Sequence, residues 1–271
     1  MIPSFYKDTI DVMAWKWICF PAWLNMKYQK NLDDPMFGYM GFDGDIEKEC
    51  LKAKDEKKDQ SYVLYFLSQE QLKHSMFPLG EYESKEEIRA IAEKNGFFNA
   101  DKPDSQDICF VTNGDYGDFL EKFRGKPYPE GHFVDESGQK LGKHRGIVRY
   151  TIGQRKGLGL ALKEPMYVVG KDLGKNQVIL STKEGLHSEG LLAYDFNWIS
   201  MDPPKAEYPV TAKTRYNAKP VPAFVSCEED GTVKVRFEKP ERAVAPGQAV
   251  VLYDGDIVVG GGTIKQALKK V

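Results

Sequence analysis

The chain has 271 residues, which is enough for one large domain or two to three small ones at ~100 to 200 residues each. Its 38 basic and 40 acidic residues nearly cancel, so net charge excludes no class of partner and any nucleic-acid surface must gather its positive charge locally. The cysteines and histidines are scattered with no Cys-x-x-Cys pair, which argues against a zinc or iron–sulfur site, and no metal is predicted.

Residues 1–50 contain tryptophans at positions 15, 17 and 23 but no sustained helical or strand period, and we predict an atypical segment of unknown fold. The apolar stretch 12–24 includes Lys16 and Pro21 and falls short of the ~20 apolar residues that a membrane span needs. Neither a signal peptide nor a membrane contact is predicted. With unpaired cysteines, the expected location is the cytoplasm.

Two helices are predicted between residues 68 and 96. Ser68 with Gln71, and Ser84 with Glu87, both have the spacing of a capping box, in which side chains satisfy the free backbone N–H groups of a helix start. Gly96 is a natural C-terminal cap for the second helix.

Beyond Gly131 the apolar period changes to two and turn signals recur, which is typical of antiparallel sheet or barrel. Residues 232–237 alternate between apolar and polar, and hairpins are predicted at Asp230-Gly231 and at Asp254-Gly255-Asp256. Asp202-Pro203-Pro204 predicts a domain boundary between residues 198 and 209, because proline interrupts regular structure.

Two segments are candidates for chemistry. Cys109 follows the polar stretch 102–107 and precedes an apolar run; a nearby lysine favours the reactive thiolate, whereas the alternative is a small buried hydrophobic residue. Arg155 and Lys156 lie among glycines in the loop 150–159 and are candidate phosphate contacts, with a plain basic turn as the alternative. This loop lacks the third glycine of a dinucleotide-binding fingerprint.

A set of short motifs resembles the tRNA-specific 2-thiouridylase family from about residue 51 to about residue 264. Their order and spacing are difficult to obtain by chance. The motifs are Lys58-Asp59-Gln60-Ser61-Tyr62, Phe77-Pro78-Leu79-Gly80, Asp104-Ser105-Gln106-x-Ile108-Cys109-Phe110, Gly142-x-His144-x-Gly146, the stretch 150–159, Arg215-Tyr216 and Pro246-Gly247-Gln248-Ala249-Val250.

The resemblance implies an enzyme that replaces the 2-oxygen of the wobble uridine of certain tRNAs with sulfur. In this family ATP adenylates the uridine oxygen, and a cysteine persulfide then delivers the sulfur; Cys109 matches the persulfide-carrying cysteine. The implied partners are tRNA and a cysteine desulfurase or sulfur-carrier protein. The implied tRNA contacts are Lys58, Asp59, Gln60, Arg215, Tyr216 and Gln248.

The sequence departs from the family pattern in two motifs. Neither the Ser-Gly-Gly-x-Asp-Ser loop that grips the ATP phosphates nor the Pro-Cys-x-x-Cys-Asn context of the nucleophilic cysteine occurs, and residues 1–50 do not resemble the missing part. ATP is therefore expected as the family's co-substrate without a site in this chain. We expect that the chain alone cannot thiolate tRNA and corresponds to the rear part of the enzyme, whether by truncation, frameshift or excision.

Two alternatives stay open: a non-catalytic tRNA-binding module in which Cys109 is idle, and a thiol protein that relays persulfide sulfur. The predicted fold class is α+β and multidomain. Residues 1–50 are the atypical segment, 51–111 the helical remnant of an α/β nucleotide-binding domain carrying Cys109, 112–190 a small β-rich central domain, and 191–271 a C-terminal antiparallel β-barrel.

Overall fold

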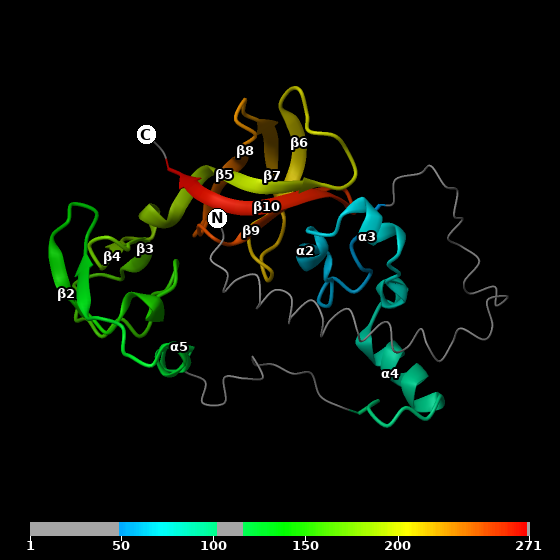
Figure 1. The fold of residues 1–271 in the computed structure, drawn as a ribbon, viewed down its shortest axis with the longest axis horizontal. Helices are drawn as coiled ribbons and strands as arrows, with labels where there is room; N and C mark the ends of the chain where they lie inside the picture. The colour runs from blue at the N-terminus through cyan, green and yellow to red at the C-terminus, as the bar shows by residue number, and fades with distance from the viewer. Residues whose placement is uncertain (1–48, 102–115, 270–271) are drawn as a thin grey trace. The chain divides into compact units, whose positions relative to one another are not determined.

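A computed structural model describes residues 49–101 and 116–269, shown in Figure 1. Cys109 lies outside the described residues. The helices are α2 (Ser61–Leu64), α3 (Gln69–Lys73), α4 (Lys85–Lys94) and α5 (Tyr116–Arg124), with 3-10 turns η2 (Pro78–Glu81), η3 (Ile147–Arg149) and η4 (Glu184–Leu186). The strands are β1 (Gly131–Val134), β2 (Lys140–His144), β3 (Tyr167–Asp172), β4 (Gln177–Ser181), β5 (His187–Trp198), β6 (Tyr208–Lys213), β7 (Val221–Cys227), β8 (Val233–Arg242), β9 (Ala249–Asp254) and β10 (Ile257–Leu268).

Both predicted helix starts are confirmed. At α3 the Ser68 hydroxyl accepts the Gln71 N–H and the Gln71 side chain accepts the Ser68 N–H, which completes the capping box. At α4 the Ser84 hydroxyl accepts the N–H of residue 87. Gly96 follows α4 in the left-handed region, with a φ of 69°, and its N–H bonds the carbonyl of residue 93, as in a Schellman cap.

Four strands of the central region form one small sheet in the order β2-β1-β4-β3. Its β1 and β4 run parallel, which differs from the purely antiparallel pairing expected from the sequence. A parallel pair needs a crossover, and β2, η3 and β3 supply it between these two strands. His144 is buried at the sheet edge: its Nε2 donates to the Asn176 carbonyl at 3.1 Å, and its Nδ1 accepts the Gly146 N–H at 3.2 Å. His144 of the Gly-x-His-x-Gly motif thus has a structural role: the hydrogen bonds of its ring hold the edge of the sheet together.

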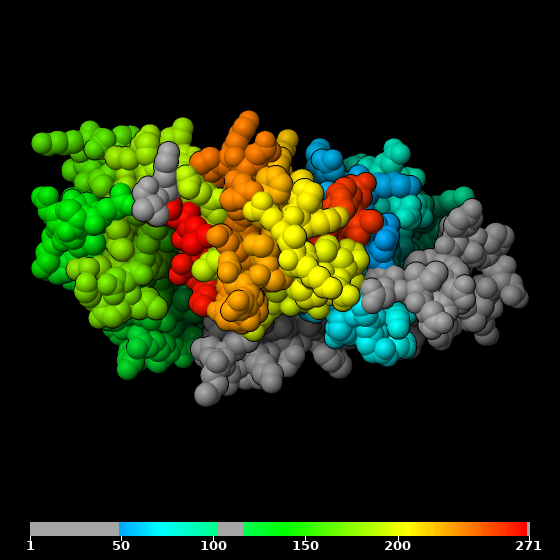
Figure 2. Space-filling model, turned by 90° about the horizontal axis from the view of Figure 1, so that it is seen from above, coloured from blue at the N-terminus to red at the C-terminus, as the bar shows by residue number. Residues whose placement is uncertain are grey.

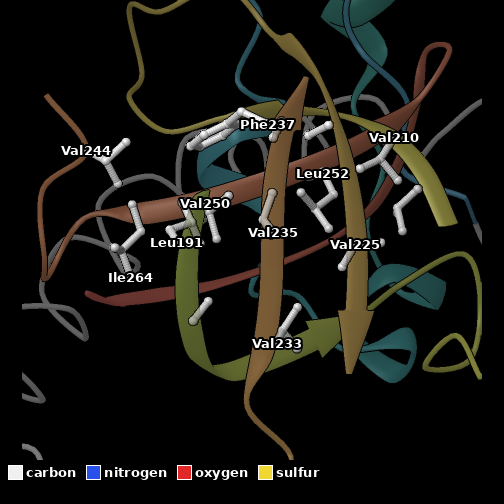
Figure 3. Packing of buried hydrophobic residues seen from close by; sticks show 14 residues of the cluster. Leu191, Val210, Val225, Val233, Val235, Phe237, Val244, Val250, Leu252 and Ile264 are labelled. Carbon is white, nitrogen blue, oxygen red and sulfur yellow. The ribbon is translucent and has the colours of Figure 1, made fainter. Parts of the chain in front are cut away.

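The C-terminal region is a closed barrel with strand order β10-β5-β8-β7-β6-β9, which confirms the predicted barrel and the α+β fold class. Alternate residues fill its interior, because successive side chains of a strand point to opposite faces. Val233, Val235 and Phe237 of β8 are buried in this core, as their alternation predicts. Figure 3 shows these side chains converging with Leu191, Val225 and Leu252 from neighbouring strands.

A second core lies on the outer face of the barrel. In β9, Val250 and Leu252 point into the barrel, whereas Val251 and Tyr253 pack outside it against Tyr62 of α2. Because both faces of β9 are covered, the strand reads as a continuous apolar run without alternation. The remaining buried members of this outer cluster are Cys50, Leu67, Leu72, Ile199 and Val258.

The first described residues extend this contact along the β9–β10 hairpin. Leu51 pairs with Ile257, and the Lys52 Nζ donates to the Gly255 carbonyl at 2.6 Å. Figure 2 shows this segment, in blue, against the orange-red atoms of the hairpin turn. Gly255 has a φ of 58°, so the turn needs the left-handed conformation that the Asp-Gly signal predicts. The helical segment and the barrel are therefore joined by packing and by backbone pairing.

The glycine run 260–262 is a packing feature within β10. A Cβ at Gly261 would come within 2.6 Å of the Tyr65 ring, and one at Gly262 within 2.7 Å of the Phe196 ring. Aromatic rings thus occupy the space that larger side chains would need.

The predicted domain boundary between residues 198 and 209 is wrong. The proline pair lies in the connection between β5 and β6, and both strands belong to the same closed barrel. Proline ends the strand, but the chain returns to the sheet it left. The strand β5 starts at His187, so it also crosses the expected boundary at residues 190 and 191.

Candidate nucleic-acid interface

The structure brings two predicted tRNA contacts from distant motifs together. The Gln60 side chain, directly before α2, donates from Nε2 to the Tyr216 hydroxyl at 2.5 Å and to the Lys58 carbonyl at 3.1 Å. Tyr216 follows β6, and its ring packs edge-on against the ring of Tyr62, with centroids 6.1 Å apart. The packing of α2 on the outside of β9 produces this meeting, because β6 is the strand beside β9.

A lysine that the sequence motifs did not include lies at the centre of this group. The Lys213 Nζ is 5.6 Å from the Tyr62 ring centroid and 5.7 Å from that of Tyr216. Lys213 pairs with Val251 in the β6–β9 register, so its side chain lies on the outer face that α2 covers. Burial lowers the pKa of Lys213, although the Asp59 carboxylate acts in the opposite direction.

Asp59 occupies a structural position beneath this group. Its Oδ1 accepts the N–H groups of Ala53 at 3.1 Å and Ser61 at 3.0 Å, and its Oδ2 accepts the Ser61 hydroxyl at 2.7 Å. The Tyr253 hydroxyl is 3.2 Å from the Ser61 hydroxyl and extends the chain of hydrogen bonds. The Asp59 side chain is buried, so it holds the start of α2 in place and leaves Gln60 at the surface.

Arg215 lies where the barrel approaches the loop that carries Arg155 and Lys156. Its Nη2 donates to the carbonyl of Ala243, a buried alanine with a φ of 55°. Alanine rarely adopts this left-handed conformation, which costs about 1 to 2 kcal/mol. The loop approaches at Gly153, where an added Cβ would lie 3.1 Å from the Ala243 Cβ and 3.6 Å from the Arg215 Nη2.

The Gln154 side chain shapes the rest of this loop. Its Oε1 accepts the Thr151 N–H at 3.0 Å, and its Nε2 donates to the Lys156 carbonyl at 3.0 Å. Arg155 and Lys156 are exposed at the tip. The loop therefore presents two exposed cations from a backbone that approaches Arg215 at Gly153, and their role as phosphate contacts stays a prediction.

The remaining predicted contacts lie on either side of this group. Gln248 is exposed in the turn before β9, next to Ala249, whose carbonyl accepts the Tyr62 hydroxyl at 2.9 Å. Lys58 is exposed and lines a cavity of about 360 Å³ with seven other residues. These residues are Asp55, Lys57, Glu83, Ser84, Lys85, Glu86 and Arg89. Burial, followed by the charges of Arg89 and Lys58, lowers the pKa of Lys85.

The two cysteines that the structure describes are not activated. Cys50 is buried in the outer cluster, and burial together with the nearby Asp59 charge raises the pKa of its thiol to about 11. Burial also raises the pKa of Cys227. A raised pKa keeps a thiol protonated and unreactive near neutral pH. Cys109, the predicted persulfide carrier, lies outside the described residues.

Within residues 49–101 and 116–269, no three His, Cys, Asp or Glu side chains gather in a way that could hold a metal ion. Nor does the described part of the chain contain a helix long and apolar enough to cross a membrane. The candidate site is thus a surface of aromatic, amide and cationic side chains. Such groups can stack on bases, bond to base edges and neutralise phosphates.

Three family models match the chain in succession. They are the tRNA methyl transferase HUP domain over residues 35–113, the tRNA methyl transferase PRC-barrel domain over 117–182, and the aminomethyltransferase beta-barrel domain over 188–264. The last two ranges coincide with the small sheet and the closed barrel. The chain is therefore of the class that joins a HUP domain to a PRC-barrel domain and a β-barrel.

Individual relatives specify the family within this class. The chain is 47% identical to the tRNA-specific 2-thiouridylase of Acetivibrio thermocellus over 254 residues, covering 92% of the chain and 70% of the relative. It is 45% identical to that of Carboxydothermus hydrogenoformans over 257 residues, with coverages of 93% and 70%. For Clostridioides difficile the identity is 48% over 217 residues, with coverages of 80% and 60%. The chain belongs to the tRNA-specific 2-thiouridylase family, and it spans 60% to 70% of the length of these relatives.

The comparisons correct one expectation about the N-terminal part. The HUP-domain match begins at residue 35, and an alignment covering 92% of the chain must include more than half of residues 1–50. The expectation that residues 1–50 bear no resemblance to the family's first domain is wrong at least for residues 35–50. Residues 35–50 carry no motif as distinctive as those further along the chain, so the motif analysis missed their resemblance to the family.

The close approach at Gly153 predicts unequal effects of two glycine substitutions. Gly153 and Gly159 have φ values of 89° and 70°, so Gly153→Ala and Gly159→Ala each incur about 1 to 2 kcal/mol of left-handed strain. A Cβ at Gly159 meets no atom within 4 Å, whereas one at Gly153 would lie only 3.1 Å from the Ala243 Cβ. We expect Gly153→Ala to lower the free energy of unfolding by about 1 kcal/mol more, as measured by urea denaturation. Equal losses would show that the loop is not fastened to the barrel.

Proposed function

We propose that the chain acts in the 2-thiolation of the wobble uridine of tRNA and that the surface around Tyr216 binds the tRNA. The observation that carries this proposal is the convergence of separate family motifs. Three separate parts of the chain meet around Tyr62. They are Gln60, the Arg215-Tyr216 pair and the turn at Gln248. Family membership supports tRNA as the substrate.

The side chains on this surface suit RNA. Tyr216 is 37% exposed and offers a ring edge and face to an unpaired base. Arg215 uses one guanidinium nitrogen on Ala243, and a guanidinium has five N–H donors, so others are available for a phosphate. Gln248 can bond a base edge or a sugar. Lys58, Arg155 and Lys156 would supply further phosphate contacts from exposed positions.

For the chemical step we propose Cys109 as the persulfide carrier, with a cysteine desulfurase or sulfur-carrier protein as donor. The family uses ATP to activate the uridine oxygen. The basic loop at residues 151–159 does not fit the ATP phosphates, because the chain continues from it into β3 rather than into a helix whose N-terminus would receive them. No step is therefore assigned to ATP among the described residues. The free thiols of Cys50 and Cys227 suit a reducing compartment, and we propose a cytoplasmic location.

Arg215→Ala tests the tRNA surface. Losing a phosphate contact should weaken binding of a tRNA transcript and reduce the slope of log affinity against log salt by ~0.7 to 0.9. Fluorescence anisotropy at several salt concentrations measures both quantities. Arg236→Ala is the matched control, since Arg236 is a barrel arginine paired with Glu207 at 2.7 Å, and it should leave the slope unchanged. An unchanged slope for Arg215→Ala would remove this residue from the interface.

Mass spectrometry tests the persulfide proposal. After incubation of the chain with cysteine and a cysteine desulfurase, we expect one added sulfur atom on the peptide containing Cys109. Cys50 and Cys227 serve as internal controls, because their raised pKa values keep them protonated. The Cys109→Ser variant should gain no sulfur. Sulfur on Cys227 in place of Cys109, or on no cysteine, would contradict the assignment.

A further inference from the structure

Lys213 is buried and makes no direct hydrogen bond or ion pair within the described part of the chain, although the Asp59 carboxylate is near enough to favour its charged form. Only 9% of the residue is exposed, yet its ammonium makes no hydrogen bond or ion pair with any described residue. The nearest favourable contacts are the Tyr62 and Tyr216 rings at 5.6 Å and 5.7 Å from Nζ, close to the ~6 Å limit for cation–π attraction. These two weak contacts leave the N–H donors of the ammonium to solvent or to a ligand.

The fold itself does not require a lysine at this position. Lys213 pairs with Val251, and the cluster around it on the outer face of the barrel is apolar. A methionine or leucine there would bury the same stem without desolvating a charge, which is the cheaper arrangement. Burial lowers the pKa of Lys213, the Asp59 carboxylate acts in the opposite direction, and the positive charge of Lys52 adds to the lowering. The lysine thus costs stability in the free protein.

The ammonium is nevertheless open to a ligand. The Lys213 Nζ is not among the fully buried side-chain nitrogens of the described residues that lack a hydrogen bond, so it keeps some contact with solvent. Gln60 and the exposed ring of Tyr216 lie beside the ammonium, and Arg215 is two residues further along the chain. A site with several cationic and neutral donors suits an anionic oxygen, and it disfavours a second cation.

We propose that Lys213 binds a backbone phosphate of the tRNA whose neighbouring base stacks on Tyr216. This inference rests on the proposed function of the surface and adds a residue that the family motifs do not include. A phosphate oxygen supplies the direct hydrogen-bond acceptors that the ammonium lacks within the described protein. The Tyr62 and Tyr216 rings already lie beside the ammonium in the free protein, at 5.6 Å and 5.7 Å from Nζ.

The test combines binding with stability. Lys213→Met keeps the stem and removes the charge, Lys213→Arg keeps the charge, and Lys239→Met neutralises an exposed lysine on the same barrel. Affinity for a tRNA transcript is measured by anisotropy between about 50 and 200 mM salt, and the melting temperature of each free variant by circular dichroism. We expect Lys213→Met to bind about tenfold more weakly, with the salt slope reduced by ~0.7 to 0.9, and to melt at the same or a higher temperature. Lys213→Arg should keep the slope, and Lys239→Met should keep both affinity and slope.

The outcomes separate this inference from the proposed function. If the unaltered chain binds no tRNA at low salt, both are overturned. If it binds, and Arg215→Ala weakens binding while Lys213→Met keeps the affinity and slope, the Lys213 inference alone fails. A lower melting temperature for Lys213→Met with unchanged tRNA affinity would assign the lysine a structural role and would likewise overturn it.

Discussion

The packing of α2 on the outer face of β9 is the contact on which the candidate site depends. A barrel strand normally presents one face to solvent, but Val251 and Tyr253 are both fully buried beneath the segment around Tyr62. Each fully buried side chain of this size contributes about 1.5 to 3 kcal/mol. The Asp59 carboxylate adds directional bonds by holding the Ala53 and Ser61 N–H groups. Together these contacts fix the start of α2 against β6, and Gln60 therefore reaches Tyr216.

This arrangement explains why residues far apart in sequence act as one surface. The barrel supplies Lys213, Arg215 and Tyr216 from the end of one strand, and the helical segment supplies Gln60. The loop at Gly153 reaches the same place from the small sheet through its close approach to Ala243. The buried alanine with positive φ at that junction is a local strain that the surrounding contacts must support. Strain and a buried cation thus occur at the same surface, as expected where binding rather than stability has shaped the residues.

Local chemistry made much of the fold predictable. The hydroxyls of Ser68 and Ser84 cap their helices because short-range spacing determines a cap, and the Asp-Gly turn at Gly255 follows from the left-handed backbone it requires. Contacts between distant segments were not predictable in this way. The proline pair before β6 has the composition of a boundary but lies inside one barrel, because strand pairing and not the loop decides which sheet the chain rejoins. Lys213 was missed for the same reason: alternation places it on the outer face, and only the fold shows that α2 covers that face.

Ultraviolet cross-linking of the chain to a tRNA transcript, with the cross-linked peptides identified by mass spectrometry, tests the central claim most directly. The aromatic rings at the surface are the groups expected to lie against bases. The account predicts that the cross-links fall on the peptides containing Tyr216 and Gln60, from two segments that meet only in the folded protein. Cross-links confined to the hairpin of β7 and β8, or to β2 and β3 of the small sheet, would contradict it.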